Sequence, residues 1–243
     1  MVKFNRNEEP NEMYKTLLWM NPNIQFVFGK NIVEYDMQSA SLSVSRRFKL
    51  LPDEKLDILE RMPKEKRTRE VGLIQRADKV FSDNMINGTL QTRKEFLTVN
   101  GLDENSIVTL HSDAIIFMQT KPVIDQIENV VFVHKHTWTS YLRYGKLEMF
   151  YGDGEITYKG IPKQMLQQHT LGICQFLLNF FQKVENNDET IYDDIAMFQK
   201  KYLMGKLPDY YYISFGNTGA YKAENLKLFG LLAQIIEKEV NCT

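Results

Sequence analysis

Hydrophobic and polar positions alternate in the segment 24–38, which reads IQFVFGKNIVEYDMQ. The segment is rich in β-branched and aromatic residues, and it is interrupted by Gly29. Such alternation predicts either a β-hairpin or a strand that ends close to Asp36. In either case we expect a strand to position the Asp36 carboxylate.

Helical spacing of apolar residues replaces this alternation in the next part of the chain. The apolar residues of the segment 51–62 recur at helical intervals up to Pro63, which would end that helix. A longer helical pattern covers residues 65–100, and we expect it to pause at Asn87-Gly88. The sequence therefore predicts a helical insertion at about residues 53–100.

Strand patterns return after this insertion. Residues 106–120 place two short apolar strands on either side of a His-Ser-Asp step, so Asp113 would lie at the turn between them. Residues 130–161 contain further strand-like segments joined by glycines, a pattern typical of an antiparallel meander.

The C-terminal third of the chain again has helical spacing. Apolar residues recur at helical intervals in residues 165–184, 191–205 and 223–240. We therefore expect an α+β fold, in which an antiparallel sheet with a helical insertion precedes a helical C-terminal region. The expected domains are residues 1–160 and 161–243, with the boundary near Gly160-Ile161-Pro162.

Composition restricts the classes of protein to consider. The 243 residues, 43% of them hydrophobic and 25% charged, suffice for one large or two small domains. Charged residues interrupt every long apolar stretch and no secretory signal is visible, so we expect a cytoplasmic protein without a membrane span. With only Cys174 and Cys242, neither a disulfide framework nor a cysteine zinc site is expected.

Charge is unevenly distributed along the chain, although the net charge is only -1. Between Arg61 and Lys79 there are seven basic residues against three acidic ones. Such a run is usually a solvated helix face. It could also form the local basic face that nucleic-acid binding needs.

Asp36 and Asp113 are candidate metal ligands. Asp36 precedes the small, polar stretch MQSASLS, although an Asp after a strand is often only a turn former or a helix N-cap. Asp113 lies between apolar strands, where an ionised carboxylate is costly unless it is paired or bound to a cation. If the fold brings the two together, Mg²⁺ or Mn²⁺ would relieve their repulsion. The pair therefore predicts a two-metal site for phosphoryl transfer.

At these residues the sequence resembles the right-hand DNA polymerases, most closely family B. Residues 35–42, YDMQSASL, resemble the first catalytic motif of that family. Residues 109–115, TLHSDAI, resemble its second motif, Tyr-x-Asp-Thr-Asp-Ser-Ile, with Asp113 at the second Asp. His111 stands in place of the first Asp and Thr109 in place of the Tyr. The resemblance implies a minimal, phage-like polymerase with a palm, a fingers-like insertion and a thumb-like C-terminal region.

The resemblance also implies roles for individual residues. Asp36 and Asp113 would be catalytic, and together with Met37 they would hold the metal ions. Lys159 would face primer phosphates, and His111 could touch a phosphate. The fingers motif of the family is not evident in the insertion, so basic residues there would hold the incoming triphosphate. The candidates are Lys66, Arg67, Arg69 and Arg76.

The leading hypothesis is a template-dependent, DNA polymerase-like nucleotidyltransferase that uses Mg²⁺ or Mn²⁺. Its partners would be a primer–template, nucleoside triphosphates and, if the enzyme is split, a second polymerase subunit. The alternative is a catalytically reduced, palm-like nucleic-acid-binding or accessory subunit of a replication complex. A metal-dependent nuclease is a third hypothesis. A phage-encoded protein would act in the host cytoplasm, and no membrane partner is expected.

Overall fold

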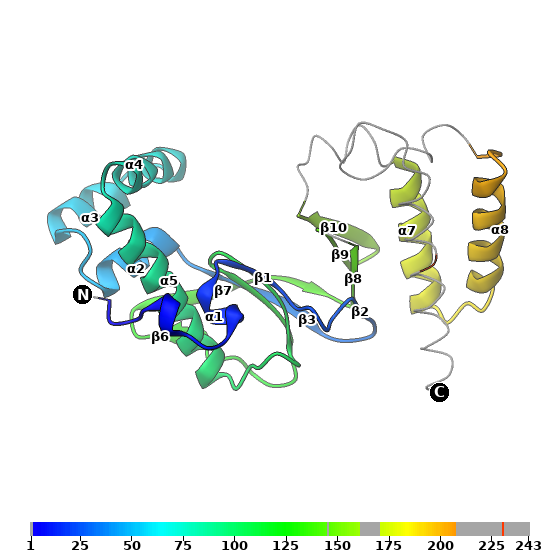
Figure 1. Ribbon diagram of the computed structural model, residues 1–243, viewed down its shortest axis with the longest axis horizontal. Helices are drawn as coiled ribbons and strands as arrows, with labels where there is room; N and C mark the ends of the chain where they lie inside the picture. The colour runs from blue at the N-terminus through cyan, green and yellow to red at the C-terminus, as the bar shows by residue number, and fades with distance from the viewer. Residues whose placement is uncertain (1, 145, 161–170, 208–229, 231–243) are drawn as a thin grey trace. The chain divides into compact units, whose positions relative to one another are not determined.

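The computed structural model describes residues 2–144, 146–160 and 171–207, together with residue 230. The chain divides into two compact units (Figure 1). Unit 1 comprises residues 1–23 and 31–137, and unit 2 comprises residues 24–30 and 138–243. Both units combine helices with antiparallel strands, so the predicted α+β class is confirmed.

Unit 1 is built on a six-stranded sheet in the order β1-β4-β5-β3-β7-β6. These strands are β1 (Leu18–Met20), β3 (Ile32–Met37), β4 (Ile107–His111), β5 (Ala114–Met118), β6 (Gln126–Ile127) and β7 (Val130–Trp138). The predicted strand at Asp36 and the predicted pair of strands around Asp113 are confirmed. The alternative of a hairpin within residues 24–38 is wrong, because β2 (Phe26–Val27) pairs with β8 (Ser140–Tyr144) of unit 2.

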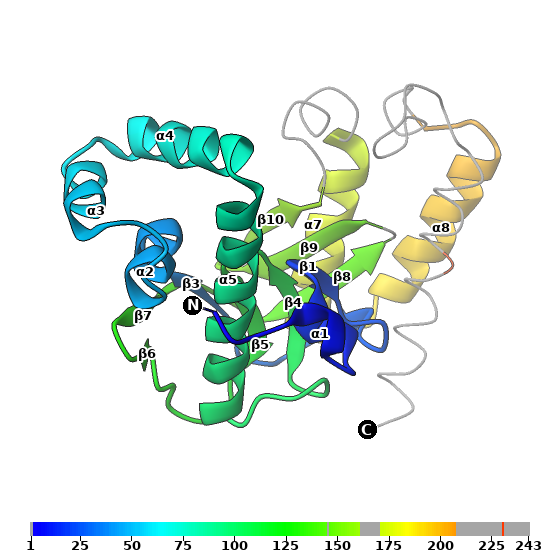
Figure 2. The ribbon, with the colours of Figure 1, turned by 60° about the vertical axis from the view of Figure 1, so that its left-hand side comes forward.

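The helices of unit 1 pack against this sheet and form the core together with it. They are η1 (Arg6–Glu8), α1 (Glu12–Lys15), α2 (Ala40–Arg47), α3 (Asp53–Glu60), α4 (Lys64–Ala77) and α5 (Lys79–Val99). Figure 2 shows the long helix α5 lying across the sheet. The ring of Phe96 on α5 lies 4.2 Å from that of Phe132 and 6.4 Å from that of Phe117, centroid to centroid. The predicted helical insertion thus ends in a helix, α5, that packs against the sheet and forms the hydrophobic core of unit 1 together with it.

The helix break within the insertion differs from the prediction. The expected pause at Asn87-Gly88 is wrong, because α5 runs through both residues without interruption. The helical segment is interrupted at Asp78 instead, between α4 and α5. The side chain of Asp78 caps α5 by accepting a hydrogen bond from the Phe81 N–H at 2.9 Å. Gly88 serves packing: a Cβ there would lie 2.8 Å from side-chain atoms of Val44 and Phe48.

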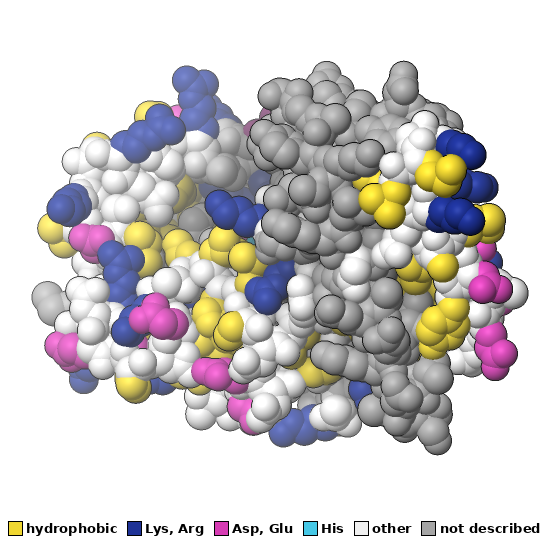
Figure 3. Space-filling model, turned by 45° about the vertical axis from the view of Figure 1, so that its right-hand side comes forward, with side chains coloured by type: hydrophobic (Ala, Val, Ile, Leu, Met, Phe, Trp, Pro, Cys, Tyr) yellow, Lys and Arg dark blue, Asp and Glu magenta, His cyan; other side chains and the backbone are white. Residues whose placement is uncertain are grey.

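Unit 2 is built on a four-stranded sheet in the order β10-β9-β8-β2. The remaining elements are β9 (Leu147–Gly152), β10 (Glu155–Lys159), α7 (Leu171–Glu185) and α8 (Ile191–Leu203). Apolar residues of β8 and β9 share a core with α7 and α8. Helix α8 also exposes apolar side chains, among them Met197 and Leu203, and Figure 3 shows apolar and basic side chains together at the surface in this part of the chain. Lys200 and Lys201 lie in the last turn of α8, where cations interact favourably with the helix dipole.

The predicted meander of residues 130–161 forms only in part. Strands β8, β9 and β10 pair in succession, whereas β7 belongs to the sheet of unit 1. The chain therefore changes sheets next to Trp138.

The last boundary between the two compact units lies after Thr137, whereas the sequence predicted a domain boundary near residue 160. The physical reason is that β8–β10 share a core with α7 and α8. The assignment of a palm-like and a thumb-like domain stays a prediction. The helix predicted over residues 223–240, apart from residue 230, lies outside the described residues. None of the described helices is long and apolar enough to cross a membrane.

Candidate metal centre

Asp36 and Asp113 meet at one end of the sheet of unit 1. Asp36 is the register partner of Ala114, the residue that follows Asp113. The Met37 N–H donates to the Asp113 carbonyl oxygen at 3.1 Å. Besides burial, the negative charge of Asp113 raises the pKa of Asp36, because the two carboxyl groups lie close together. The fold therefore joins two carboxyl groups that are distant in the sequence.

The surroundings of Asp36 make its ionised form costly. Burial raises the pKa of Asp36, and the negative charge of Asp113 raises it further. Glu34, two residues earlier on β3, adds to this rise, whereas the positive charge of Lys135 on β7 opposes it. A carboxylate pair in this setting favours a proton or a cation between its members.

The donor set fits a hard divalent cation. Carboxylate oxygens are the ligands that Mg²⁺ prefers, and Mg²⁺ commonly takes one or two carboxylates and completes its shell with water and phosphate oxygens. In the described parts of the chain, no group of three or more His, Cys, Asp or Glu could hold a metal ion. Asp36 and Asp113 would therefore hold an ion together with substrate or solvent oxygens.

Met37 offers a more limited contribution than the carboxylates. Its side chain is 2% exposed and belongs to the hydrophobic core of unit 1. Its N–H group is engaged with Asp113. The backbone carbonyl oxygen is thus the atom through which Met37 would ligate a metal, and this role stays a prediction.

The candidate triphosphate-binding residues on α4 face different ways. Arg67 is half-buried, and its Nη2 atom lies 3.5 Å from Ser39 Oγ, at the start of α2 and three residues after Asp36. Lys66, Arg69 and Arg76 are exposed, and helical geometry places them together on another side of α4. The structure therefore connects Arg67 with the turn behind Asp36, and it presents the other three to solvent.

Local contacts surround the two proposed nucleic-acid-binding residues. The Nε2 atom of His111 lies 3.2 Å from Thr109 Oγ1, whose own proton is donated to the Trp19 carbonyl oxygen. A hydroxyl has one proton, so His111 Nε2 must be the donor in this contact. In unit 2, Lys159 Nζ lies 5.7 Å and 5.8 Å from the ring centroids of Trp138 and Phe150. Phosphate binding by either residue stays a prediction.

A comparison with protein families matches almost the whole chain. A family model described as Bacteriophage PBS1 gene 130 protein matches residues 9–241. The chain belongs to this family. Membership supports the phage origin implied by the polymerase resemblance, but the description names a gene and no activity. No curated protein matches the chain.

Sequence patterns identified the two carboxylates of this phage-family protein but missed the charged residues around them. Alternation along β3 places Glu34 on the same face as Asp36, so Glu34 could have been found from the sequence. Lys135 offered no such signal, because its proximity to Asp36 depends on β7 lying next to β3 in the sheet.

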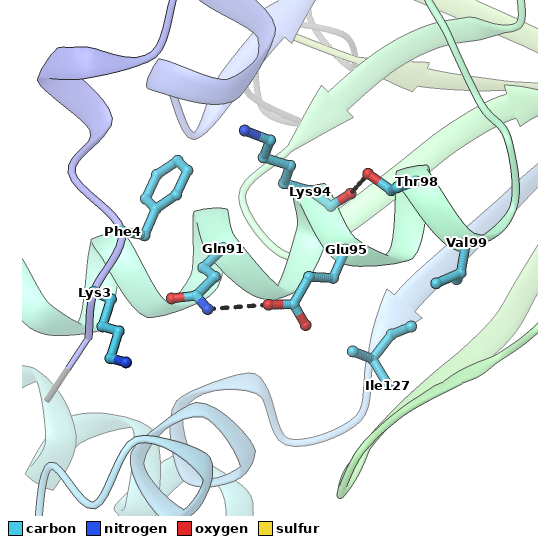
Figure 4. A pocket seen from close by; sticks show the side chains of 8 residues that line it. All are labelled: Lys3, Phe4, Gln91, Lys94, Glu95, Thr98, Val99 and Ile127. Atoms are coloured by element: carbon cyan, nitrogen blue, oxygen red, sulfur yellow. Dashed lines mark hydrogen bonds between the residues drawn. The ribbon is translucent and has the colours of Figure 1, made fainter.

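A cavity of about 480 Å³ in unit 1 lies apart from the carboxylate pair. Figure 4 shows its lining side chains, which come from the N-terminal segment, α5 and β6. They are Lys3, Phe4, Gln91, Lys94, Glu95, Thr98, Val99 and Ile127. Neither Asp36 nor Asp113 lines this cavity, so the candidate metal centre lies elsewhere on the unit.

Proposed function

We propose that this protein is a template-dependent, DNA polymerase-like nucleotidyltransferase that uses Mg²⁺ or Mn²⁺. The observation that carries the proposal is the placement of Asp36 beside Asp113 at the end of an antiparallel sheet, where Asp36 pairs with Ala114 and the Met37 N–H donates to the Asp113 carbonyl oxygen. The order of elements also supports it: Asp36 is followed by helices α2 to α5, then by Asp113 and further strands.

Each group would have a defined task. Asp36 and Asp113 would hold the ions, which supply charge stabilisation for the attack of a primer 3′-hydroxyl on the α-phosphate of a nucleoside triphosphate. Arg67 would pair with triphosphate oxygens, because a guanidinium fork matches phosphate geometry. Lys159 and His111 would contact the nucleic-acid backbone. The enzyme would act in the cytoplasm of the phage host, alone or with a second polymerase subunit.

Primer extension with Mg²⁺ or Mn²⁺ tests this proposal. Asp36→Asn and Asp113→Asn should each lower the extension rate by about 100-fold or more, as the loss of a group that stabilises transition-state charge does. Asp53→Asn, which alters an exposed carboxylate on α3, is the matched control and should extend primers like the wild type. Full activity in both active-site variants would refute the proposal, and primer shortening would point to a nuclease.

The second candidate function is a palm-like accessory subunit that binds nucleic acid without turnover. It is favoured by one departure from the polymerase motif, namely His111 at the position of the first Asp. Such a protein would be inert alone and active only with a partner. Its binding to nucleic acid should weaken steeply with salt, because bound cationic side chains release counterions from the phosphates.

The exposed basic residues of α4 provide the test of nucleic-acid binding. Changing Lys66, Arg69 and Arg76 together to Gln should reduce the slope of log K against log salt by about one for each phosphate that the variant no longer neutralises. The double variant of Lys200 and Lys201 to Gln, on α8, removes exposed cations elsewhere and should leave the slope unchanged. Binding that does not depend on salt would contradict this function.

A further inference from the structure

Arg93 is a buried cation at the centre of unit 1. It lies on α5 and is 0% exposed. Burial lowers the pKa of Arg93 to about 10, so the side chain remains charged at neutral pH. A buried charge is costly unless hydrogen bonds compensate it, and in the described residues the guanidinium donates to four backbone carbonyl oxygens.

Three of these carbonyl groups belong to the N-terminal segment and the fourth belongs to the turn of Asp113. Nη2 donates to the Met13 carbonyl oxygen at 3.0 Å and to the Thr16 carbonyl oxygen at 2.5 Å. Nη1 donates to the carbonyl oxygens of Leu17 and Ser112, each at 3.1 Å. Arg93 therefore links α5 to the residue immediately before Asp113.

The hydrogen bonds around Ser112 form a closed ring. The Ser112 N–H donates to the Leu17 carbonyl oxygen at 2.6 Å, and that same oxygen accepts from Arg93. Both backbone polar groups of Ser112 are thus engaged. Ser112 has a φ of 53°, in the left-handed region that is uncommon for residues other than glycine. Such a conformation persists only where its surroundings enforce it, and the ring supplies that enforcement.

We propose that Arg93 is a positioning residue that fixes the Ser112–Asp113 turn, so that the Asp113 carboxylate stays beside Asp36 and can share a divalent cation with it. On the other side of the turn, the Asp113 carbonyl oxygen accepts from the Met37 N–H. Arg93 and Met37 therefore hold the turn between α5 and β3. The metal-binding part of this inference rests on the proposed function.

The experiment measures Mn²⁺ binding by electron paramagnetic resonance in full-length variants that circular dichroism shows to be folded. Arg93→Met removes the charge, and Arg93→Lys keeps the charge but cannot reproduce the planar, multiply donating fork. Both should weaken Mn²⁺ binding by about tenfold or more, the usual cost of losing a group that orients a metal ligand. Leu59→Ala, which removes a buried side chain of α3 from the same core but touches none of these hydrogen bonds, should stay within about twofold of the wild type.

Amide hydrogen exchange provides a second readout that needs no metal. Protection of the Met37 N–H should fall by about tenfold or more in Arg93→Lys and remain unchanged in Leu59→Ala. A folded Arg93→Lys protein with wild-type Mn²⁺ binding or wild-type Met37 protection would overturn the proposal. An equal loss in Leu59→Ala would overturn it as well, since the effect of Arg93 would then be a general loosening of the core. Wild-type protein that binds Mn²⁺ through both carboxylates but extends no primer would refute polymerase function of the chain by itself and leave the role of Arg93 intact.

Discussion

Asp36 shows how a single residue can be placed by the sequence and yet have its chemistry set by distant neighbours. The alternating pattern located the strand that carries it, and this strand is confirmed. The raised pKa of Asp36, however, arises from burial and from the charges of Asp113 and Glu34, and the charge of Lys135 opposes it. Apart from Glu34, these neighbours reach Asp36 only through strand pairing, so the sequence alone could not give their combined effect.

The metal-free protein should be more stable after Asp36→Asn at neutral pH. Because the folded-state pKa of Asp36 lies above its unfolded value, its contribution to stability is present in acid and is lost as pH rises through the folded pKa. Removing one of two like charges at a half-exposed site is worth about 1 kcal/mol, or about 2–4 °C in Tm for a chain of this size.

Thermal melts of both proteins in EDTA from acid to neutral pH provide the measurement. The difference in Tm should be absent below about pH 3, where free Asp is protonated, and should grow towards neutral pH. Adding Mg²⁺ should reverse its sign, because only the wild type has both carboxylates to bind the ion. A variant that is less stable than the wild type in EDTA at neutral pH would contradict the prediction.

At the scale of elements, helix α5 illustrates the limits of local sequence signals. Its apolar spacing and the strands around Asp113 were predicted and are confirmed. The continuity of α5 through Gly88 was not predicted, because a glycine that ends a helix and a glycine that allows close packing look alike in sequence. Likewise, nothing local distinguishes β7 from the strands after it, although β7 lies in a different sheet.

Gly88→Ala should destabilise the protein by about 1–3 kcal/mol, the usual cost of overpacking. The added Cβ would approach Val44 Cγ1 and Phe48 Cδ2 to 2.8 Å, which forces α2 away from α5. Gly72→Ala on α4 is the matched control, since its Cβ would meet nothing within 4 Å. It should stabilise the protein by about 0.5–1 kcal/mol through helix propensity. Urea unfolding gives the free energy of unfolding of both variants. Equal changes in the same direction would contradict the packing role of Gly88.

At the scale of the whole molecule, the chain crosses between its two units more than once. Residues 24–30 belong to unit 2 although they lie between two parts of unit 1. Sequence patterns suggested a single boundary near residue 160, because strand and helix signals change there. They could not reveal that β2 pairs with β8, since pairing between distant short strands leaves no periodic trace.

A fragment of residues 1–137 should fold and should bind Mn²⁺ with wild-type affinity. It contains Asp36, Asp113 and Arg93, together with every charged neighbour that shifts the pKa of Asp36. Within it, residues 24–30 would be only a short loop, which costs little entropy to close. Circular dichroism and Mn²⁺ titration measure the outcome, with Asp113→Asn in the same fragment as control. An unfolded fragment would show that the carboxylate site needs unit 2.

The placement of β2 also sets an order of events during synthesis. Phe26 and Val27 leave the ribosome long before Tyr141 and Leu142, their register partners on β8. Strands β3, β4, β5 and β7 emerge in between, so the sheet of unit 1 can assemble while β2 has no partner strand. The nascent chain therefore carries β2 without its partner strand while the remaining strands of unit 1 are synthesised, and β8 is the first element that can pair with it.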